Sequence, residues 1–547
     1  MDQDIALLER ALEQLPDWPI EKVVGQLFSL AVGSHSNGTE AFWDDPQTVL
    51  SLVRKYQVGG ICYYTVGDDG TDPRVTTEIA RQFQSSVELP LLFAADQEGG
   101  MISRVREPAL RMPSAMAQSA TADWELIEHL AELGGGDLRR AGFNFAYAPV
   151  ADVNTEPANP VIGVRSPSSS PKVVGRFDVA VVRGLEKTGV ASCLKHFPGH
   201  GNTNVDSHVG LPVLTTTKEE WEQTEAVPFK AGIHAGADSV MMGHLVVPGL
   251  DPSGVPATFS RPIVTGLLRE HLGFEGVIVT DALDMAGAGH PGGSAGACVD
   301  ALLAGNDQLL MPLVPEEGIE GVIAAVQEGR LDVARLRDSA RRILKLKLKL
   351  ARKWDELECV GAHANATVLE WKSASQTDAD LVSDVFARAL TWRDPNLSWT
   401  VPSDRLISIV ADIGPPDYRR GSVDFAPVLQ RALANEGIPA RVATADEVGR
   451  GTTDGPTILI SRNASLDVES ADLIRQLAPH ADLVIATRSP YDASLVPEDL
   501  PMLLVYGDIA PAIPALTRAL LTGTAPGILP VDLVDSQGQV RWPRRVK

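Results

Sequence analysis

The chain has 547 residues, of which 44% are hydrophobic and 22% are charged. This is ordinary globular usage, which argues against general disorder and, at this length, for two or three domains. The 48 Lys and Arg against 71 Asp and Glu give a net charge of −23, which opposes non-specific attraction to nucleic acid and to anionic membrane surfaces.

The start of the chain lacks the features of a secretory signal. Asp2 and Asp4 stand where a signal would need a basic start, and no uncharged apolar stretch follows. No uncharged run approaches the ~18–20 apolar residues that span a bilayer. The cysteines are too few and too scattered for a disulfide framework or a cysteine-based zinc site; they are Cys62, Cys193, Cys298 and Cys359. These features predict a cytoplasmic protein.

Short apolar runs, each ended by Gly, Pro, Asp or His, follow one another through the first two thirds of the chain. They lie at 27–32, 58–63, 90–95, 143–149, 191–196, 238–244, 276–281 and 307–311. Helical periodicity occupies stretches between them, such as 76–87, 124–141 and 171–187. This alternation is typical of a parallel sheet covered by helices. Eight such units over about 350 residues match a (β/α)₈ TIM-like barrel, with a doubly wound open sheet as the alternative.

A second unit follows the barrel. Residues 332–354 form a basic helical pattern, and the chain is then polar to about 397, with one helical pattern at 380–392. Apolar runs at 406–411, 457–461, 482–487 and 502–506 again alternate with helical segments, which favours a smaller α/β sandwich. We therefore expect a catalytic barrel domain over 1–353, a linker over 354–397 and a C-terminal α/β sandwich domain over 398–547.

Ionisable residues stand at the ends of the predicted barrel strands. They are Asp96, Lys195, His196, His244 and Asp281. Active sites of (β/α)₈ barrels lie at the carboxyl ends of the strands. Any one of these residues alone could be a loop residue with a local hydrogen bond. Their common placement favours a functional cluster.

The segment Lys195–Gly201 reads KHFPGHG and leads to Asp206 and His208. Its proline and glycines break a helix and predict a loop. Zinc bound by His196, His200 and His208 is one interpretation, although Lys195 would repel a cation. The sharper interpretation is that Asp206 orients His208 and raises its basicity, as in other Asp–His dyads. The third interpretation is that the histidine has only a structural role in the loop.

Two common enzyme classes lack their motifs. The sequence contains no Gly-x-Ser-x-Gly nucleophile elbow and no Gly-x-x-x-x-Gly-Lys-Ser/Thr phosphate loop. What remains is the carboxylate of Asp281 at the barrel mouth, together with a histidine able to donate and accept a proton. That pair suits a displacement at an acetal carbon.

Four segments occur in a characteristic order: DQEGG at 96–100, KHFPGHG at 195–201, DSH at 206–208 and TDALDM at 280–285. Together they resemble glycoside hydrolase family 3, in its β-N-acetylglucosaminidase branch, over roughly residues 20–350. The resemblance implies that Asp281 is the nucleophile that forms a glycosyl-enzyme. It also implies that His208 is the acid/base, with Asp206 as its partner.

The resemblance further implies a set of ligands for sugar hydroxyls, namely Asp96, Arg104, Arg165, Lys195 and His196. Lysine and arginine side chains donate without accepting and therefore suit hydroxyl oxygens. Two features depart from the family. Met101 replaces a frequent arginine, and the segment 387–393 only loosely resembles the usual connection to the second domain. Asp284 is a competing candidate for the nucleophile, which we expect to point away from the site.

The expected activity is that of a retaining exo-β-N-acetylglucosaminidase. Its substrates would be muropeptide fragments, in cell-wall recycling, or chitooligosaccharides, and the partner is this small carbohydrate, with no metal and no cofactor. One alternative is a phosphorylase of the same bond, because a neutral histidine repels phosphate less than a glutamate would. A catalytically silent sugar-binding protein is a third possibility, although such a protein would be expected to lack the nucleophile or the acid/base.

Overall fold

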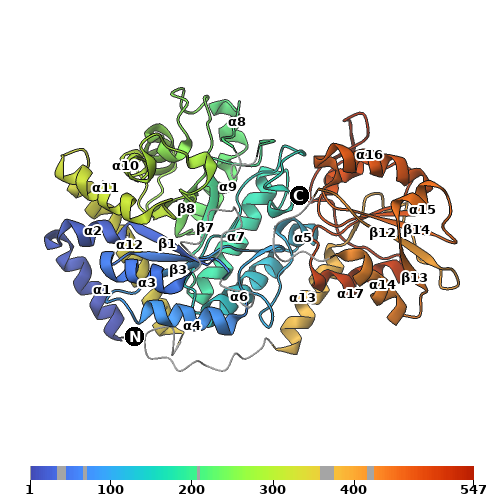
Figure 1. The fold of residues 1–547 in the computed structure, drawn as a ribbon, viewed down its shortest axis with the longest axis horizontal. Coiled ribbons are helices and arrows are strands. Elements are labelled where there is room, and N and C mark those ends of the chain that lie inside the picture. The colour runs from blue at the N-terminus through green and yellow to red at the C-terminus, as the bar shows by residue number, and fades with distance from the viewer. Residues whose placement is uncertain are drawn as a thin grey trace.

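Two domains make up this computed structural model (Figure 1). The structure describes residues 2–33, 45–65, 71–205, 210–357, 375–415 and 424–546. The first domain is drawn from blue to yellow and the second from orange to red. In the described part of the chain, no helix is both long enough and apolar enough to cross a bilayer.

Eight parallel strands form the first domain, and each falls within one of the predicted apolar runs or overlaps its end. They are β1 Phe28–Val32, β2 Gly60–Tyr63, β3 Leu92–Ala95, β6 Phe145–Ala146, β7 Cys193–Phe197, β8 Ser239–Met242, β9 Val277–Thr280 and β10 Leu309–Leu310. Ladders join them in the orders β10-β1-β2-β3-β6 and β7-β8-β9. Parallel bridges Phe145↔Ala191 and Val279↔Gln308 link these two groups. The strands therefore close into a ring, which confirms the barrel and excludes the open sheet.

Helices surround this barrel. They are α1 Asp2–Gln14, α2 Ile20–Gln26, α3 Pro46–Tyr56, α4 Pro73–Gln84, α5 Ala115–Ala120, α6 Trp124–Arg140, α7 Pro171–Thr188, α8 Lys218–Gln223, α9 Ala226–His234, the π-helix η4 Pro262–His271, α10 Gly293–Ala304, α11 Pro315–Gln327 and α12 Val333–Glu356. Several begin with the expected signals: the side chains of Asp45, Asp72, Asp123 and Asp332 accept first-turn N–H groups. A short hairpin follows β3, with strands β4 Gln97–Gly99 and β5 Ile102–Ser103.

A six-stranded sheet forms the second domain, in the order β11-β16-β15-β14-β12-β13, with only β11 antiparallel to its neighbour. The strands are β11 Thr391–Trp392, β12 Ile407–Ile413, β13 Ala440–Ala443, β14 Thr457–Ser461, β15 Leu483–Ala486 and β16 Met502–Leu504. Helices cover both faces, namely α13 Gln376–Ala389, α14 Phe425–Asn435, α15 Ala445–Gly449, α16 Val468–Leu477 and α17 Ile513–Thr522 (Figure 1).

Alternate residues of these strands face the two helical layers. Ile458 and Ile485 belong to the apolar cluster with α13, α14 and α17, whereas Leu459 and Val484 belong to the cluster with α15 and α16. This period of two is what a sheet buried on both faces requires. The small hairpin β17 Leu533–Val534 and β18 Val540–Trp542 completes the α/β sandwich.

The predicted linker, 354–397, contains regular structure in its described part. Helix α13 and strand β11 lie within it, and both pack on the second domain: β11 pairs with β16, and α13 shares an apolar cluster with α17. Residues 358–374 lie outside the described residues. The domain boundaries themselves stay a prediction.

The second domain docks on α5 and α6 of the barrel domain. Leu126 and Leu130 of α6 lie in one buried cluster with Phe386 of α13. The Arg388 guanidinium lies 2.7 Å from the Asp123 carboxylate, and Ile528 N–H donates to the carbonyl of Ala120 at 2.8 Å. Arg388 lies within the segment 387–393. This segment only loosely resembles the family's usual connection, so the sequence alone did not predict how the second domain docks.

Candidate active site

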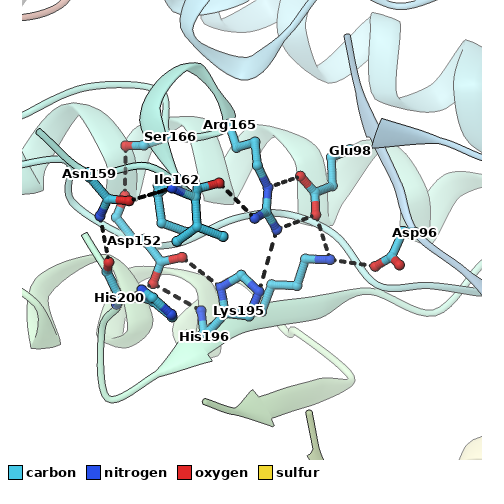
Figure 2. A network of polar contacts seen from close by, with 11 residues as sticks. Asp96, Glu98, Asp152, Asn159, Ile162, Arg165, Ser166, Lys195, His196 and His200 are labelled. Carbon is cyan, nitrogen blue, oxygen red and sulfur yellow. Dashed lines mark hydrogen bonds and ion pairs between the residues drawn. The ribbon is translucent and has the colours of Figure 1, made fainter. Parts of the chain in front are cut away.

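Charged side chains meet at the carboxyl ends of β3 and β7 (Figure 2). Asp96 directly follows β3, and Lys195 lies within β7. The Nζ atom of Lys195 is 2.7 Å from Asp96 Oδ1 and 2.6 Å from Glu98 Oε1. The carboxylate of Glu98 in turn contacts Arg165 through two hydrogen bonds, of 2.8 and 2.9 Å. The strand ends thus bring together three predicted sugar ligands, with Glu98 as the bridge between two of them.

Burial alone would raise the pKa values of the two carboxyl groups in this network. The charges of Lys195 and Arg104 outweigh it at Asp96 and hold its pKa below the ordinary value. At Glu98, the charges of Arg165 and Lys195 also outweigh burial and hold its pKa well below the ordinary value. Burial would lower the pKa of Lys195, but Asp96 and Glu98 raise it. The network is therefore a set of ionised pairs at neutral pH.

Arg104 directly follows strand β5, and its side chain extends to the same group of residues. Its Nη2 atom lies 3.7 Å from Asp96 Oδ2, and its guanidinium lies over the ring of Tyr64, 4.6 Å from the ring centroid. The side chain is 23% exposed, whereas Lys195 is 2% exposed. Arg104 is thus the more accessible of these two cations and borders the mouth.

His196 is held by a carboxylate. Its Nδ1 atom lies 2.7 Å from Asp152 Oδ2, and its Nε2 atom lies 3.5 Å from Arg165 Nη2. His200 packs edge-on against His196, with ring centroids 5.8 Å apart, and is almost fully buried. Burial is the main cause that lowers the pKa of His200 to about 4. His200 is therefore an uncharged residue of the loop at neutral pH.

Asp281, the predicted nucleophile, directly follows β9 and is half-buried. Its N–H donates to Met242 of β8 at 2.8 Å, and its Oδ1 accepts from Ala282 N–H at 2.8 Å. These bonds fix the carboxylate at the end of the strand. The structure does not support the expectation that Asp284 points away, because its carboxyl oxygens are buried and its charge acts on Cys62 and Tyr64 at β2.

His244 also stands just past a strand end, but it is fully buried. Its Nδ1 atom lies 2.8 Å from Thr258 Oγ1, and its Nε2 atom lies 2.9 Å from the carbonyl oxygen of Ala282. Both ring nitrogens are thus engaged with protein groups. His244 supports the turn that follows Asp281.

The predicted acid/base pair, Asp206 and His208, lies outside the described residues. The loop that leads to it is closely packed where it is described. The indole N–H of Trp221 donates to the carbonyl of Pro198 at 2.8 Å. A Cβ atom on Gly201 would lie 1.9 Å from the carbonyl oxygen of Val153, so only glycine fits there.

The sequence alone suggested no role for two residues of this network, Glu98 and Asp152. Glu98 lies inside the DQEGG segment, and Asp152 lies in the segment that follows β6. Their partners, Arg165 and His196, are 67 and 44 residues away in the sequence. The signal that could have found them is a carboxylate near a strand end among several buried cations.

The described residues contain no group of three or more His, Cys, Asp and Glu side chains arranged to hold a metal ion. The zinc interpretation needed His208, which is not among them. That the protein works without a metal or a cofactor stays a prediction.

A closed (β/α)₈ barrel with paired charges and a strand-end carboxylate at its mouth is the arrangement of barrel enzymes. The model of the glycosyl hydrolase family 3 N-terminal domain matches residues 20–346. The chain therefore belongs to glycosyl hydrolase family 3, as its motifs indicated.

Relatives match different shares of the chain. It is 37% identical over 332 residues to beta-hexosaminidase A of Pseudoalteromonas piscicida, covering 56% of each chain. It is 30% identical to the beta-N-acetylglucosaminidase/beta-glucosidase of Cellulomonas fimi, covering 64% of this chain and 60% of that one. Thus the chain spans little more than half the length of these two relatives. The solved glycoside hydrolase family 3 beta-N-acetylglucosaminidase of Paenibacillus sp. strain FPU-7 is 29% identical, with a TM-score of 0.82, covering 94% of this chain and 99% of that one.

Proposed function

We propose that this protein is a retaining exo-β-N-acetylglucosaminidase that releases terminal β-linked N-acetylglucosamine. The observation that carries the proposal is the strand-end carboxylate of Asp281 in a mouth that also holds Asp96, Lys195 and Arg165. The positive charges of Lys195 and Arg165 are balanced by the negative charges of Asp96 and Glu98. The mouth therefore suits a neutral ligand with many hydroxyls. The similarity to a beta-hexosaminidase and to a beta-N-acetylglucosaminidase supports the choice of sugar.

The reaction divides into two displacements. Asp281 attacks the anomeric carbon, and the bond to the leaving oxygen breaks as His208 donates a proton to it. Water then attacks the glycosyl-enzyme, His208 takes its proton, and Asp281 leaves as a carboxylate. Two inversions at one carbon amount to retention. Asp206 orients the imidazole, and the ligands Asp96, Arg104, Arg165, Lys195 and His196 hold the sugar hydroxyls.

The natural substrate is proposed to be a muropeptide fragment or a chitooligosaccharide, hydrolysed in the cytoplasm. A role in cell-wall recycling would follow from the first of these. Both substrates end in the same sugar, and the contacts that support the proposal concern only that sugar.

Purified protein with a chromogenic β-N-acetylglucosaminide provides the test, with product analysis in the presence and absence of phosphate. We expect free N-acetylglucosamine as the product under both conditions, initially as its β-anomer. A sugar 1-phosphate formed only with phosphate would replace the hydrolase by the phosphorylase. Sugar binding without turnover would favour the catalytically silent protein.

A further inference from the structure

Three carboxyl groups form a buried cluster, and two of them contact the loop Lys195–Gly201. Asp152 follows β6, Asp178 lies on α7 and Glu225 directly precedes α9; their exposed fractions are 0%, 0% and 4%. The charge of Asp152 acts on both of the other groups. Glu225 packs against Gly199 of the loop, where an added Cβ would lie 2.5 Å from its Cγ atom. A region closed to solvent cannot hold three like charges at low cost, so the charge must be unequally shared.

Hydrogen bonds favour the carboxylate form of Asp152 over that of its two neighbours. Its Oδ1 accepts the backbone N–H groups of His196 and His200 at 3.0 and 2.7 Å, and its Oδ2 lies 2.7 Å from the His196 ring (Figure 2). Neither oxygen of Asp178 has a hydrogen-bond partner in the described part of the chain, and the same is true of Glu225 Oε2. Donors stabilise the carboxylate form, and their absence favours the neutral acid.

The pKa values of the two neighbours agree with this assignment. Burial, with a further contribution from the charge of Asp152, raises the pKa of Asp178 well above its ordinary value. Burial is also the main cause that raises the pKa of Glu225 to about 7, with added contributions from Glu220 and Asp152. Burial and the lack of donors thus both favour the neutral acid at Asp178.

The two ring nitrogens of His196 face groups of opposite character. Nδ1 faces the carboxylate of Asp152, which only accepts, whereas Nε2 faces the guanidinium of Arg165, which only donates. The carboxylate calls for a proton on Nδ1, and the guanidinium calls for a lone pair on Nε2, so the two contacts together favour the Nδ1–H tautomer.

We propose that Asp152 is a positioning residue of the sugar site. It is the hydrogen-bonded carboxylate of the buried cluster, holds His196 as the Nδ1–H tautomer and ties both ends of the loop 196–200 to one side chain. This inference rests on the proposed function, because it assigns His196 Nε2 as an acceptor for a sugar hydroxyl. Lys195 and Arg165 can only donate to such a hydroxyl, so Nε2 would add a second acceptor for hydroxyl protons beside the carboxylate of Asp96. The 3.5 Å contact between Arg165 and Nε2 is long, and a bound hydroxyl can replace it.

The tautomer is measured directly by ¹⁵N NMR on the full chain with labelled histidine, with the His196 signal identified by its loss in His196→Gln. We expect a proton on Nδ1 and a pyridine-type Nε2 at neutral pH. The Nε2–H tautomer in the wild-type protein would overturn the proposal. This readout requires neither turnover nor a folded Asp152 variant, so it stands apart from the test of the glycosidase activity.

The matched variants are Asp152→Asn and Asp178→Asn, which each replace one carboxyl group of the same buried cluster by an amide of equal size. Asp152→Asn should lower kcat/KM by about 10- to 100-fold, the equivalent of losing a hydrogen bond to a charged group. It should also weaken the binding of free N-acetylglucosamine and shift the His196 tautomer. Asp178→Asn replaces a carboxyl group for which burial favours the neutral acid. We expect its kcat/KM to stay within about two-fold of the wild type and the His196 tautomer to stay unchanged.

Equal losses in the two variants would show that Asp152 acts only as one of several buried acids, and would refute the proposal. So would a folded Asp152→Asn protein with an unchanged His196 tautomer. If the wild-type protein hydrolyses no hexosaminide, the proposed function fails, and the tautomer and sugar-binding measurements still decide the role of Asp152.

Discussion

Replacing Glu98 by glutamine tests whether the buried ion pairs hold the site together. The carboxylate of Glu98, whose side chain is 3% exposed, contacts Lys195 Nζ at 2.6 Å and Arg165 through two bonds. Glutamine keeps the size but removes the charge, which leaves two buried cations short of a partner. Breaking such a pair costs about 3–5 kcal/mol. Because Lys195 keeps its contact with Asp96, we expect the lower end, about 3 kcal/mol of unfolding free energy.

Urea unfolding followed by circular dichroism measures this loss as a shift of the midpoint at unchanged slope. Glu107→Gln is the matched control, because Glu107 also contacts an arginine, Arg111, at 3.4 Å, but its side chain is 61% exposed. Such a surface pair contributes about 0–1 kcal/mol. Glu98→Gln should also weaken the binding of N-acetylglucosamine, since Lys195 and Arg165 lose their common support.

A loss for Glu98→Gln that lies within about 1 kcal/mol of the control would refute this reasoning. It would mean that water or the remaining partners compensate the two cations fully. The network would then be a solvated cluster whose charges contribute little to the stability of the barrel.

Three further predictions concern the chemistry and the base of the barrel. Asp281→Asn should lower kcat by orders of magnitude while sugar binding persists, and a fluorinated sugar should label Asp281 and not Asp284. His208→Ala should lower the hydrolysis rate most for aryl glycosides with poor leaving groups, which need protonation. Asp206→Ala should show the same dependence on the leaving group with smaller losses. Losses that are independent of leaving-group pKa would contradict the assignment. Lys347 on α12 is 3% exposed, its Nζ donates to Gln26 Oε1 at 2.8 Å, and burial lowers its pKa to about 7. The unfolded chain binds more protons between pH 7 and 10.5, so stability should rise with pH across this window, and Lys347→Met should remove this rise. Unfolding midpoints at pH 7 and 10 measure it.

The barrel was predictable because its strands are buried on both faces. Each of the eight apolar runs contains or overlaps a strand, since a fully buried parallel strand reads as an uninterrupted apolar stretch. In the second domain the strands β12, β14, β15 and β16 were predicted for the same reason. The edge strand β13, ARVA, was missed because it is short and largely accessible, so its sequence lacks that signal.

The site was predictable only as far as strand ends determine position. That rule brought Asp96, Lys195 and Asp281 to one end of the barrel. It could not distinguish His244, whose ring nitrogens are both engaged by protein groups, from His196, whose Nε2 lies beside the predicted sugar ligand Arg165. The roles of Glu98 and Asp152 arise from pairs between distant segments, which single-sequence spacing does not reveal.

The second domain supports the segment that follows β6 and carries Arg165. Asn154 Nδ2 donates to the hydroxyl of Tyr491 at 2.9 Å, and the hydroxyl of Ser168 donates to the carbonyl of Pro530. These bonds lie before and after Arg165 in the sequence, and Arg165 lines, together with Tyr491, a cleft between the domains. A shift of the second domain would therefore release both flanks of the segment that orients this arginine. The geometry of the proposed sugar site thus depends on a domain that supplies none of its predicted ligands.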